Sequence, residues 1–175
     1  MTDPFVVHVT TLRRNPGTSS HEERHGVVEM AGPLHEEGID PGRSVVPEGA
    51  EAQVVVDVTA FSGGIEVKGT VSAPWTGICR RCATPVGGQL EVPVQERFAP
   101  GSANPNEDEL YPITDGTIDL QPLARDAIVL ELPMAPLCRE DCLGLCPQCG
   151  ADRNEGECGC VAPRDARWAN LDVLR

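Results

Sequence analysis

The sequence predicts an α+β fold, an antiparallel β-rich body with one packed helix and a small C-terminal tail stapled by its cysteines. Several valine-rich segments alternate apolar and polar residues, which is typical of half-buried strands. Residues 120–132 space their apolar side chains as a helix does. Six of the eight cysteines lie between Cys138 and Cys160. We therefore expect a body formed by residues 1–137 and a tail formed by residues 138–175.

The N-terminal half of the chain is expected to contribute three strands. Residues 5–10 form the first, and residues 13–50, which are punctuated by Pro and Gly, are predicted to be loops. Residues 53–60 and 65–71 form the next two strands, separated by a Ser-Gly-Gly turn signal. Because only 3% of the residues are aromatic, the core must consist of Val, Leu, Ile and Ala.

A β-hairpin is expected to follow. Residues 90–98 alternate as a strand, and Pro93 makes this an edge or bulged strand because proline lacks the N–H of a sheet ladder. The motif Cys79-Arg-Arg-Cys82 lies between this strand and the preceding one, so we place it at the hairpin tip. Residues 100–112 are polar and are predicted to form an exposed loop.

The clearest helix is predicted for residues 120–132. Asp119 can cap its start, Pro122 is tolerated in the first turn, and Pro133 ends it. The helical spacing of its apolar residues predicts that it packs on the sheet. A second, short amphipathic helix is expected at the C-terminus around Trp168.

The cysteines offer ligands for two metal ions. They form four close pairs: Cys79 with Cys82, Cys138 with Cys142, Cys146 with Cys149, and Cys158 with Cys160. A tetrahedral zinc site takes four thiolates at about 2.3 Å, and a tight turn between two cysteines supplies two of them. Disulfides are the alternative, but the N-terminus lacks the basic and apolar regions of a secretory signal, which disfavours an oxidising compartment. We therefore expect two structural zinc ions as cofactors.

The grouping of the four pairs follows from proximity, although the swapped pairing also fits the spacing. The favoured grouping has a first site of Cys79, Cys82, Cys138 and Cys142, and a second of Cys146, Cys149, Cys158 and Cys160. The first would staple the tail to the hairpin tip. Sites filled by four thiolates have no open position and are structural, not hydrolytic. A rubredoxin-like iron centre that carries electrons is the rival interpretation, and the scarcity of aromatic residues disfavours it.

Residues 21–25, His-Glu-Glu-Arg-His, match the HExxH pattern of zinc proteases. In those enzymes the motif lies on a buried helix, whereas charged Glu23 and Arg24 fill the variable positions here. We interpret the segment as a solvated loop or a capped surface turn. No nucleophile–base pair and no phosphate-binding glycine loop is recognisable, so neither an enzyme nor a small-molecule substrate is expected.

The formal charge of −13 favours basic partners over phosphate backbone. Two filled four-thiolate sites would bring the charge to about −17. Solubility alone is an equally weighted explanation for the acidity. No apolar run approaches the ~20 residues of a membrane span, so we expect a cytoplasmic protein without a membrane partner. Direct contact with RNA is a further alternative, through Arg80, Arg81, Arg164, Arg167 and Trp168, although these arginines more simply offset thiolate and carboxylate charge.

Motifs in order along the chain resemble those of the YceD family, the large ribosomal RNA subunit accumulation proteins. The motifs are Cys79-x-Arg81-Cys82, Glu-Leu-Pro at 131–133, Leu-Cys-Arg-Glu-Asp-Cys-Leu-Gly-Leu-Cys-Pro-Gln-Cys-Gly at 137–150, and Cys158-Gly-Cys160. Some family members keep the first two cysteine pairs but lack the four later cysteines, and this supports the favoured grouping. The family usually has Asp-Pro-Arg where this chain has Asp165-Ala166-Arg167.

This resemblance implies a factor needed for normal accumulation of large-subunit ribosomal RNA, and hence for ribosome assembly, with no known reaction. The resemblance also implies that the gene neighbours that of a small, basic zinc-ribbon protein of the large subunit, as is common in the family. Together with the negative charge, this predicts binding to a basic ribosomal protein or to a pre-large-subunit particle, so that ribosomal RNA is contacted directly or indirectly.

Overall fold

The computed structural model describes residues 3–30, 44–101 and 110–161. Within these residues, seven strands and two helices form two sheets, β2-β3-β4-β5-β6 and β1-β7. All strand pairs are antiparallel except β5 with β6, which is parallel. The predicted α+β, strand-rich class is therefore confirmed. The elements are β1 (Val6–His8), α1 (Thr10–Arg14), β2 (Ser19–Val27), β3 (Glu51–Phe61), β4 (Gly64–Ile78), β5 (Pro85–Pro100), β6 (Tyr111–Ile113), β7 (Thr117–Asp119) and α2 (Gln121–Glu131).

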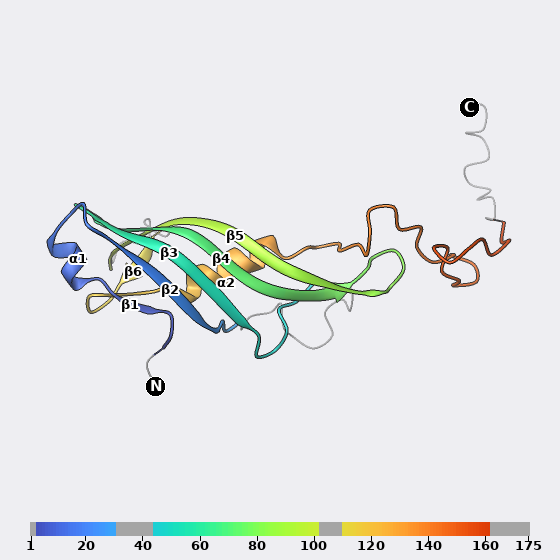
Figure 1. Cartoon of the computed structure of the whole chain (residues 1–175), viewed down its shortest axis with the longest axis horizontal. Coiled ribbons are helices and arrows are strands. Elements are labelled where there is room, and N and C mark those ends of the chain that lie inside the picture. The colour runs from blue at the N-terminus through green and yellow to red at the C-terminus, as the bar shows by residue number, and fades with distance from the viewer. Residues whose placement is uncertain (1–2, 31–43, 102–109, 162–175) are drawn as a thin grey trace, which may run out of the picture.

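The long strands β3, β4 and β5 set the shape of the molecule (Figure 1). They run along its long axis as a twisted sheet, with α2 against one face. The cysteine-rich tail, drawn in orange and red, extends beyond the β4–β5 tip, at the end opposite α1. The body thus presents one hairpin tip toward the tail.

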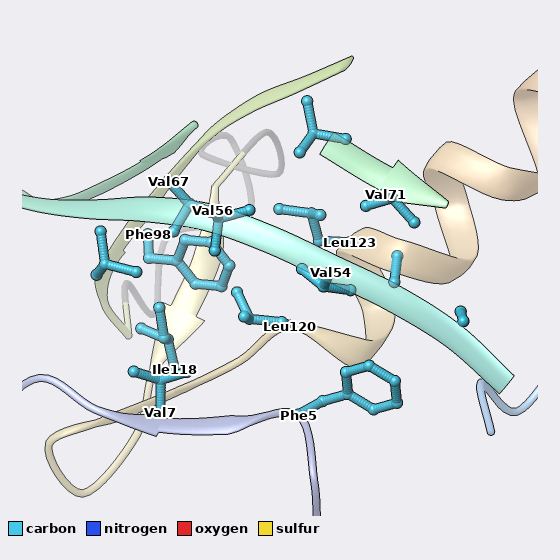
Figure 2. Close-up of a cluster of buried hydrophobic side chains, with 14 of the residues drawn as sticks. Phe5, Val7, Val54, Val56, Val67, Val71, Phe98, Ile118, Leu120 and Leu123 are labelled. Carbon is cyan, nitrogen blue, oxygen red and sulfur yellow. The ribbon is translucent and has the colours of Figure 1, made fainter. Parts of the chain in front are cut away.

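One continuous apolar core lies between the sheet, α2 and the β1–β7 pair (Figure 2). Alternate residues of β3 point into it, because successive side chains of a strand face opposite sides of the sheet. From α2, the helical spacing brings Leu123, Ala124 and Ile128 onto the same core. Two aromatic rings, Phe5 and Phe98, are fully covered within it. The predicted packing of the helix on the sheet is therefore confirmed.

The β4–β5 hairpin is longer than the sequence indicated. Its register runs from the Ile65↔Phe98 pair to the Ile78↔Pro85 pair, so that the Cys79–Cys82 motif occupies the tip as predicted. Pro93 lies opposite Thr70 of β4, whereas β6 pairs only with the last three residues of β5. Among the residues that the structure describes, the other edge of β5 at Pro93 has no strand partner, in agreement with the predicted edge position.

The interpretation of residues 13–50 as loops is wrong for residues 19–27. These form β2, which pairs with β3 over its whole length. The HExxH match lies on this edge strand, so the interpretation of that segment as a loop or turn is also wrong, although it is no protease helix. His21 and His25 point outward, where they contact Asp57 at 2.9 Å and Glu23 at 3.1 Å.

The remaining elements refine the sequence prediction. The helix α2 begins one residue later than expected, and the Asp119 carboxylate accepts a hydrogen bond of 2.9 Å from the Gln121 N–H at its start. The short α1 was not anticipated, and residues 111 and 112, expected to be loop, belong to β6. The expected terminal helix, Arg164, Arg167 and Trp168 lie outside the described residues. None of the helices in the described ranges is long and apolar enough to cross a membrane.

Candidate metal centres

The first cysteine knuckle is a tight turn at the β4–β5 tip. The Cys79 N–H donates to the Thr84 carbonyl at 2.8 Å, and the Ala83 N–H donates back to the Cys79 carbonyl at 2.9 Å. These two bonds close the turn and place the side chains of Cys79 and Cys82 on the same side. The turn requires a left-handed backbone at Ala83, which has a φ of 60°.

The second knuckle repeats this turn in the tail. The Cys146 N–H donates to the Ala151 carbonyl at 2.8 Å, and the Gly150 N–H donates to the Cys146 carbonyl at 2.9 Å. Gly150, at a φ of 73°, takes the position that Ala83 takes in the first knuckle. The two turns are therefore an internal structural repeat, with glycine at the strained position in one copy and alanine in the other.

The eight sulfur atoms gather into two groups of four. Within each group, all ligand atoms lie within 4.8 Å of one another. In the first group, the Cys79 and Cys142 sulfurs are 3.8 Å apart and the Cys82 and Cys138 sulfurs are 3.6 Å apart. None of the eight cysteines forms a disulfide. The first group contains Cys79, Cys82, Cys138 and Cys142, and the second contains Cys146, Cys149, Cys158 and Cys160, as proximity in the sequence favours.

These distances fit a tetrahedral metal ion. Four thiolates about 2.3 Å from a central zinc lie about 3.8 Å from one another. A disulfide would instead bring two sulfurs to about 2.05 Å. Four cysteines leave no position for water or substrate on a tetrahedral ion, so the donor sets suit structural sites. Both groups could hold zinc or iron, since either metal accepts four thiolates.

Arg81 holds the tail against the hairpin tip. Its guanidinium donates to the carbonyls of Glu140 and Cys142, at 3.1 and 2.9 Å. Its own carbonyl accepts the Leu145 N–H at 2.9 Å. Gly144 passes so close that a Cβ atom at that position would lie 2.7 Å from the Arg81 carbonyl oxygen. Arg81, predicted as a contact for RNA or a partner, is therefore engaged within the chain.

Backbone amides stabilise the thiolate form of the first cysteine in each knuckle. Burial alone would raise the pKa of Cys79, but the backbone N–H groups of Cys138 and Cys82 help to lower this pKa to about 6. In the second knuckle, the backbone N–H of Cys149 is the foremost cause that lowers the pKa of Cys146 to about 6. Each knuckle thus offers one thiol that ionises readily and can bind a cation.

One thiol of each group, Cys138 in the first and Cys160 in the second, is harder to ionise. Burial and the neighbouring Cys82 thiol raise the pKa of Cys138 to about 12. The thiol of Cys149 is the first cause that raises the pKa of Cys160 to about 12. Four thiolates within a few ångströms repel one another, so complete ionisation needs a cation among them. This electrostatic demand is a second reason why the donor sets suit a divalent metal.

The two groups differ in exposure. Three cysteines of the first group are buried, and only Cys138 is exposed. In the second group, Cys146 alone is buried. The first group is thus integrated with the hairpin, whereas the second lies mostly at the surface of the tail.

Sequence reasoning missed two side chains near the sulfurs. The Thr84 hydroxyl lies 3.2 Å from the Cys82 sulfur and is the foremost cause that lowers the pKa of Cys82. The Asn154 amide donates to the Cys142 sulfur at 3.4 Å. Thr84 could have been suspected from its place just after the first knuckle, but no local pattern marks Asn154. Arg80, the other predicted contact at this tip, is exposed and donates its backbone N–H to the Pro136 carbonyl at 2.9 Å.

The fold and the sulfur clusters together define a β-rich protein whose hairpin tip and tail are joined through paired cysteine knuckles. The family model described as "Large ribosomal RNA subunit accumulation protein YceD" matches residues 67–175. This span takes in most of the β4–β5 hairpin, α2 and the tail. The chain belongs to the YceD family.

Relatives extend the similarity to the N-terminal strands. An uncharacterized protein of Mycobacterium tuberculosis is 39% identical over 172 residues, which cover 96% of this chain and 80% of the relative. An uncharacterized protein of Mycobacterium leprae is 37% identical over 151 residues, covering 84% of this chain and 66% of the relative. No solved structure matches the chain.

A plant relative carries a functional name. The "Large ribosomal RNA subunit accumulation protein YCED homolog 1, chloroplastic" of Arabidopsis thaliana is 28% identical over 160 residues, which cover 74% of this chain. The matched part spans 50% of that plant protein's own length.

Proposed function

We propose that this chain is a non-enzymatic assembly factor that supports the accumulation of large-subunit ribosomal RNA, with two structural zinc ions. Membership of the YceD family is the observation that carries the proposal. The chloroplast relatives from Arabidopsis thaliana and Zea mays carry the same role in their names. The proposal places the protein in the cytoplasm, where a bacterial large subunit assembles.

The direct partner in this proposal is a basic ribosomal protein, or a pre-large-subunit particle that carries one. The chain has 27 acidic residues against 14 Lys and Arg, for a net charge of −13. A surface with this excess of carboxylates attracts lysine- and arginine-rich proteins and speeds their association. It repels bare phosphate backbone, so we favour a protein contact over direct binding to ribosomal RNA.

The zinc ions in this proposal hold the tail in place and take no part in chemistry. The sulfur spacing fits a tetrahedral ion, and each cluster supplies four ligands, so the metal has no open position. The tail, residues 138–175, is then a separate unit that is joined to the body, residues 1–137, at the hairpin tip. Metal analysis of the purified protein distinguishes zinc from a coloured iron centre.

The test is affinity purification of the tagged chain from its native cytosol at low salt, followed by sedimentation. The expected result is co-migration with an immature large subunit or with one basic ribosomal protein, and loss of that complex as salt rises. A deletion strain should show a lowered ratio of large- to small-subunit ribosomal RNA.

Nuclease treatment of the purified complex serves as the control for direct RNA binding. Retention of the basic protein after nuclease supports a protein contact, whereas a complex held only by RNA supports the RNA-binding alternative. An unchanged RNA ratio in the deletion strain, together with a chain that sediments alone, would overturn the proposed function. Arg81 is unsuitable as a probe for RNA contact, because its guanidinium holds the tail.

A further inference from the structure

Asn154 belongs to the loop of the second cluster but reaches a ligand of the first. In the sequence it lies between Cys149 and Cys158, two residues of the second group. Its side-chain Nδ2 donates to the Cys142 sulfur of the first group at 3.4 Å. Its Oδ1 accepts the N–H of Leu143, the residue that follows Cys142, at 2.8 Å.

The Asn154 amide uses all of its hydrogen-bonding capacity in this position. An Asn side chain offers two N–H donors and an oxygen with two lone pairs. The second donor binds Asp152 Oδ1 at 2.6 Å, and the second lone pair accepts Arg139 Nη2 at 2.7 Å. These partners fix the orientation of the amide, so that an N–H, not the oxygen, faces the sulfur.

The backbone of the second cluster's loop places Asn154 there. Leu145 and Asp152 form an antiparallel bridge, and the Arg153 N–H donates to the Gly144 carbonyl at 2.9 Å. The Asp152 carboxylate also accepts the Asn154 N–H at 2.8 Å. This turn lies between the two pairs of cysteines that make up the second cluster, so a metal ion bound there fixes both of its ends.

An N–H aimed at a thiolate stabilises its negative charge and orients it toward the metal. Partners of this kind, which contact the ligand and not the ion, alter metal affinity by roughly 10- to 100-fold when they are removed. Cys142 is buried, so water is a poor substitute for the lost donor.

We propose that Asn154 is a positioning residue that couples the two metal centres. Filling the second cluster fixes the Asn154 amide against the Cys142 sulfur, and this raises the metal affinity of the first cluster. By linkage, filling the first cluster raises the affinity of the second by the same factor. The inference rests on the proposed structural metal ions, and it adds a coupling between the two sites that the cysteine ligands alone do not provide.

The test titrates the full chain with cadmium or zinc against a competing chelator and measures the affinity of each cluster. Relative to the unaltered protein, the C158S/C160S variant, in which the second cluster is disabled, should bind metal at the first cluster about tenfold more weakly. Asn154→Ala should lower the affinity of the first cluster by a similar factor in the otherwise intact chain. Asn154→Ala combined with C158S/C160S should lower the metal affinity of the first cluster little more than either change alone.

Gln148→Ala is the matched control, because it also truncates an amide side chain close to the second cluster, between Cys146 and Cys149. The Gln148 side chain donates to the Val161 carbonyl and not to a sulfur of the first group. The affinity of the first cluster should therefore stay unchanged in this variant. A loss equal to that of Asn154→Ala would overturn the inference, because it would indicate a general loosening of the loop.

The double variant N154D/D152N separates the hydrogen bond to sulfur from a purely structural role. It preserves the net charge and an amide–carboxylate pair, and the carboxylate introduced by N154D could still accept from Leu143 and Arg139. That carboxylate presents an oxygen instead of an N–H to Cys142. We expect the cadmium-113 resonance of the first cluster to shift and its affinity to fall, while the second resonance stays in place.

The outcomes separate this inference from the proposed function. If both clusters bind metal but N154D/D152N keeps the affinity and resonance of the first cluster, Asn154 does not couple the centres and the assembly role is untouched. If neither cluster of the unaltered chain binds metal, the proposed metal centres themselves fail. Loss of metal from both clusters in every variant, with the sheet intact, would also contradict a specific role for Asn154.

Discussion

Ala83 and Gly150 occupy equivalent positions in the two knuckles. Ala83 has a φ of 60°, which an L-residue adopts at a cost of roughly 1–2 kcal/mol, whereas Gly150 takes the corresponding place in the tail. Ala83→Gly removes this strain but adds freedom to the unfolded chain. We expect the free energy of unfolding of the metal-bound protein to rise by up to about 1 kcal/mol, as measured by denaturant titration. A clear loss of stability would contradict the proposed equivalence of the two turns.

Tyr111 is the single tyrosine of the chain and reports on the groove between β5 and α2. Burial, together with its hydrogen bond of 3.0 Å to the Asp126 carboxylate, raises the pKa of Tyr111 to about 12. A phenol with a raised pKa stabilises the fold while it is neutral. Its contribution is complete below the unfolded-state pKa of about 10 and is lost as the pH rises toward 12.

Near-ultraviolet absorbance measures this titration directly, because no other tyrosine contributes. The native protein should form tyrosinate well above the pH at which the unfolded chain does. Asp126→Asn should move the midpoint downward, since it removes the carboxylate charge next to the phenol. An unshifted midpoint in the native protein would show that Tyr111 is open to water.

Among the elements, the docking of the tail on the hairpin depends on close approach at Gly144. Gly144 and Gly150 have almost the same left-handed φ, 72° and 73°. A Cβ at Gly144 would meet the Arg81 carbonyl oxygen at 2.7 Å, whereas one at Gly150 meets nothing within 4 Å. The two glycines therefore share the conformational cost of a Cβ but not the clash.

This contrast predicts different outcomes for two alanine variants. Gly150→Ala should lower the free energy of unfolding by about 1 kcal/mol, because it reproduces the backbone strain already tolerated at Ala83. Gly144→Ala should separate Arg81 from the tail and weaken metal binding by the first cluster, which a chelator competition measures. Equal metal affinity of the first cluster in both variants would show that this contact does not dock the tail.

Elements with apolar periodicity were predictable from the sequence. The segments that became β3, β4 and α2 bury alternate or helically spaced apolar residues, and those signals are local. The strand β2 was not predicted, because the side chains on its inward face are polar. Arg24 contacts Glu22 at 2.6 Å on that face, and Ser20 donates to Glu22 at 3.0 Å, so no apolar alternation marks the strand.

The candidate metal centres were predictable in part, for a similar reason. Pairs of cysteines separated by a few residues make a cluster almost independently of the rest of the fold. The contacts of Arg81 and Asn154 arise only when the tail lies against the hairpin. The spacing of residues in the sequence therefore does not predict them. The sequence accordingly predicts Arg81 only as a contact for RNA or a partner, and it does not single out Asn154.

At the scale of the whole molecule, the residues up to α2 and residues 138–161 differ in what they bury. The body has a continuous apolar core from β1 to α2 that contains no cysteine. Between residues 138 and 161, the buried side chains are the sulfurs of Cys142 and Cys146. Metal ligation can contribute on the order of 10 kcal/mol to the folding of a small cysteine-rich segment. In the body, the apolar core has this stabilising role.

Removal of metal should therefore unfold the tail and leave the sheet. Far-ultraviolet circular dichroism should retain its β signal after chelation, because the core makes no use of the sulfurs. Trypsin should then cleave after Arg139 and Arg153, while sites in the sheet such as Arg24 and Arg97 stay protected, and added zinc should restore resistance. Simultaneous loss of the β signal and of protection at Arg97 would mean that body and tail unfold as one unit. In that case the first cluster would be required for the stability of the sheet. The cluster lies at the tip of the β4–β5 hairpin, and the strands of this hairpin pair with β3 and β6.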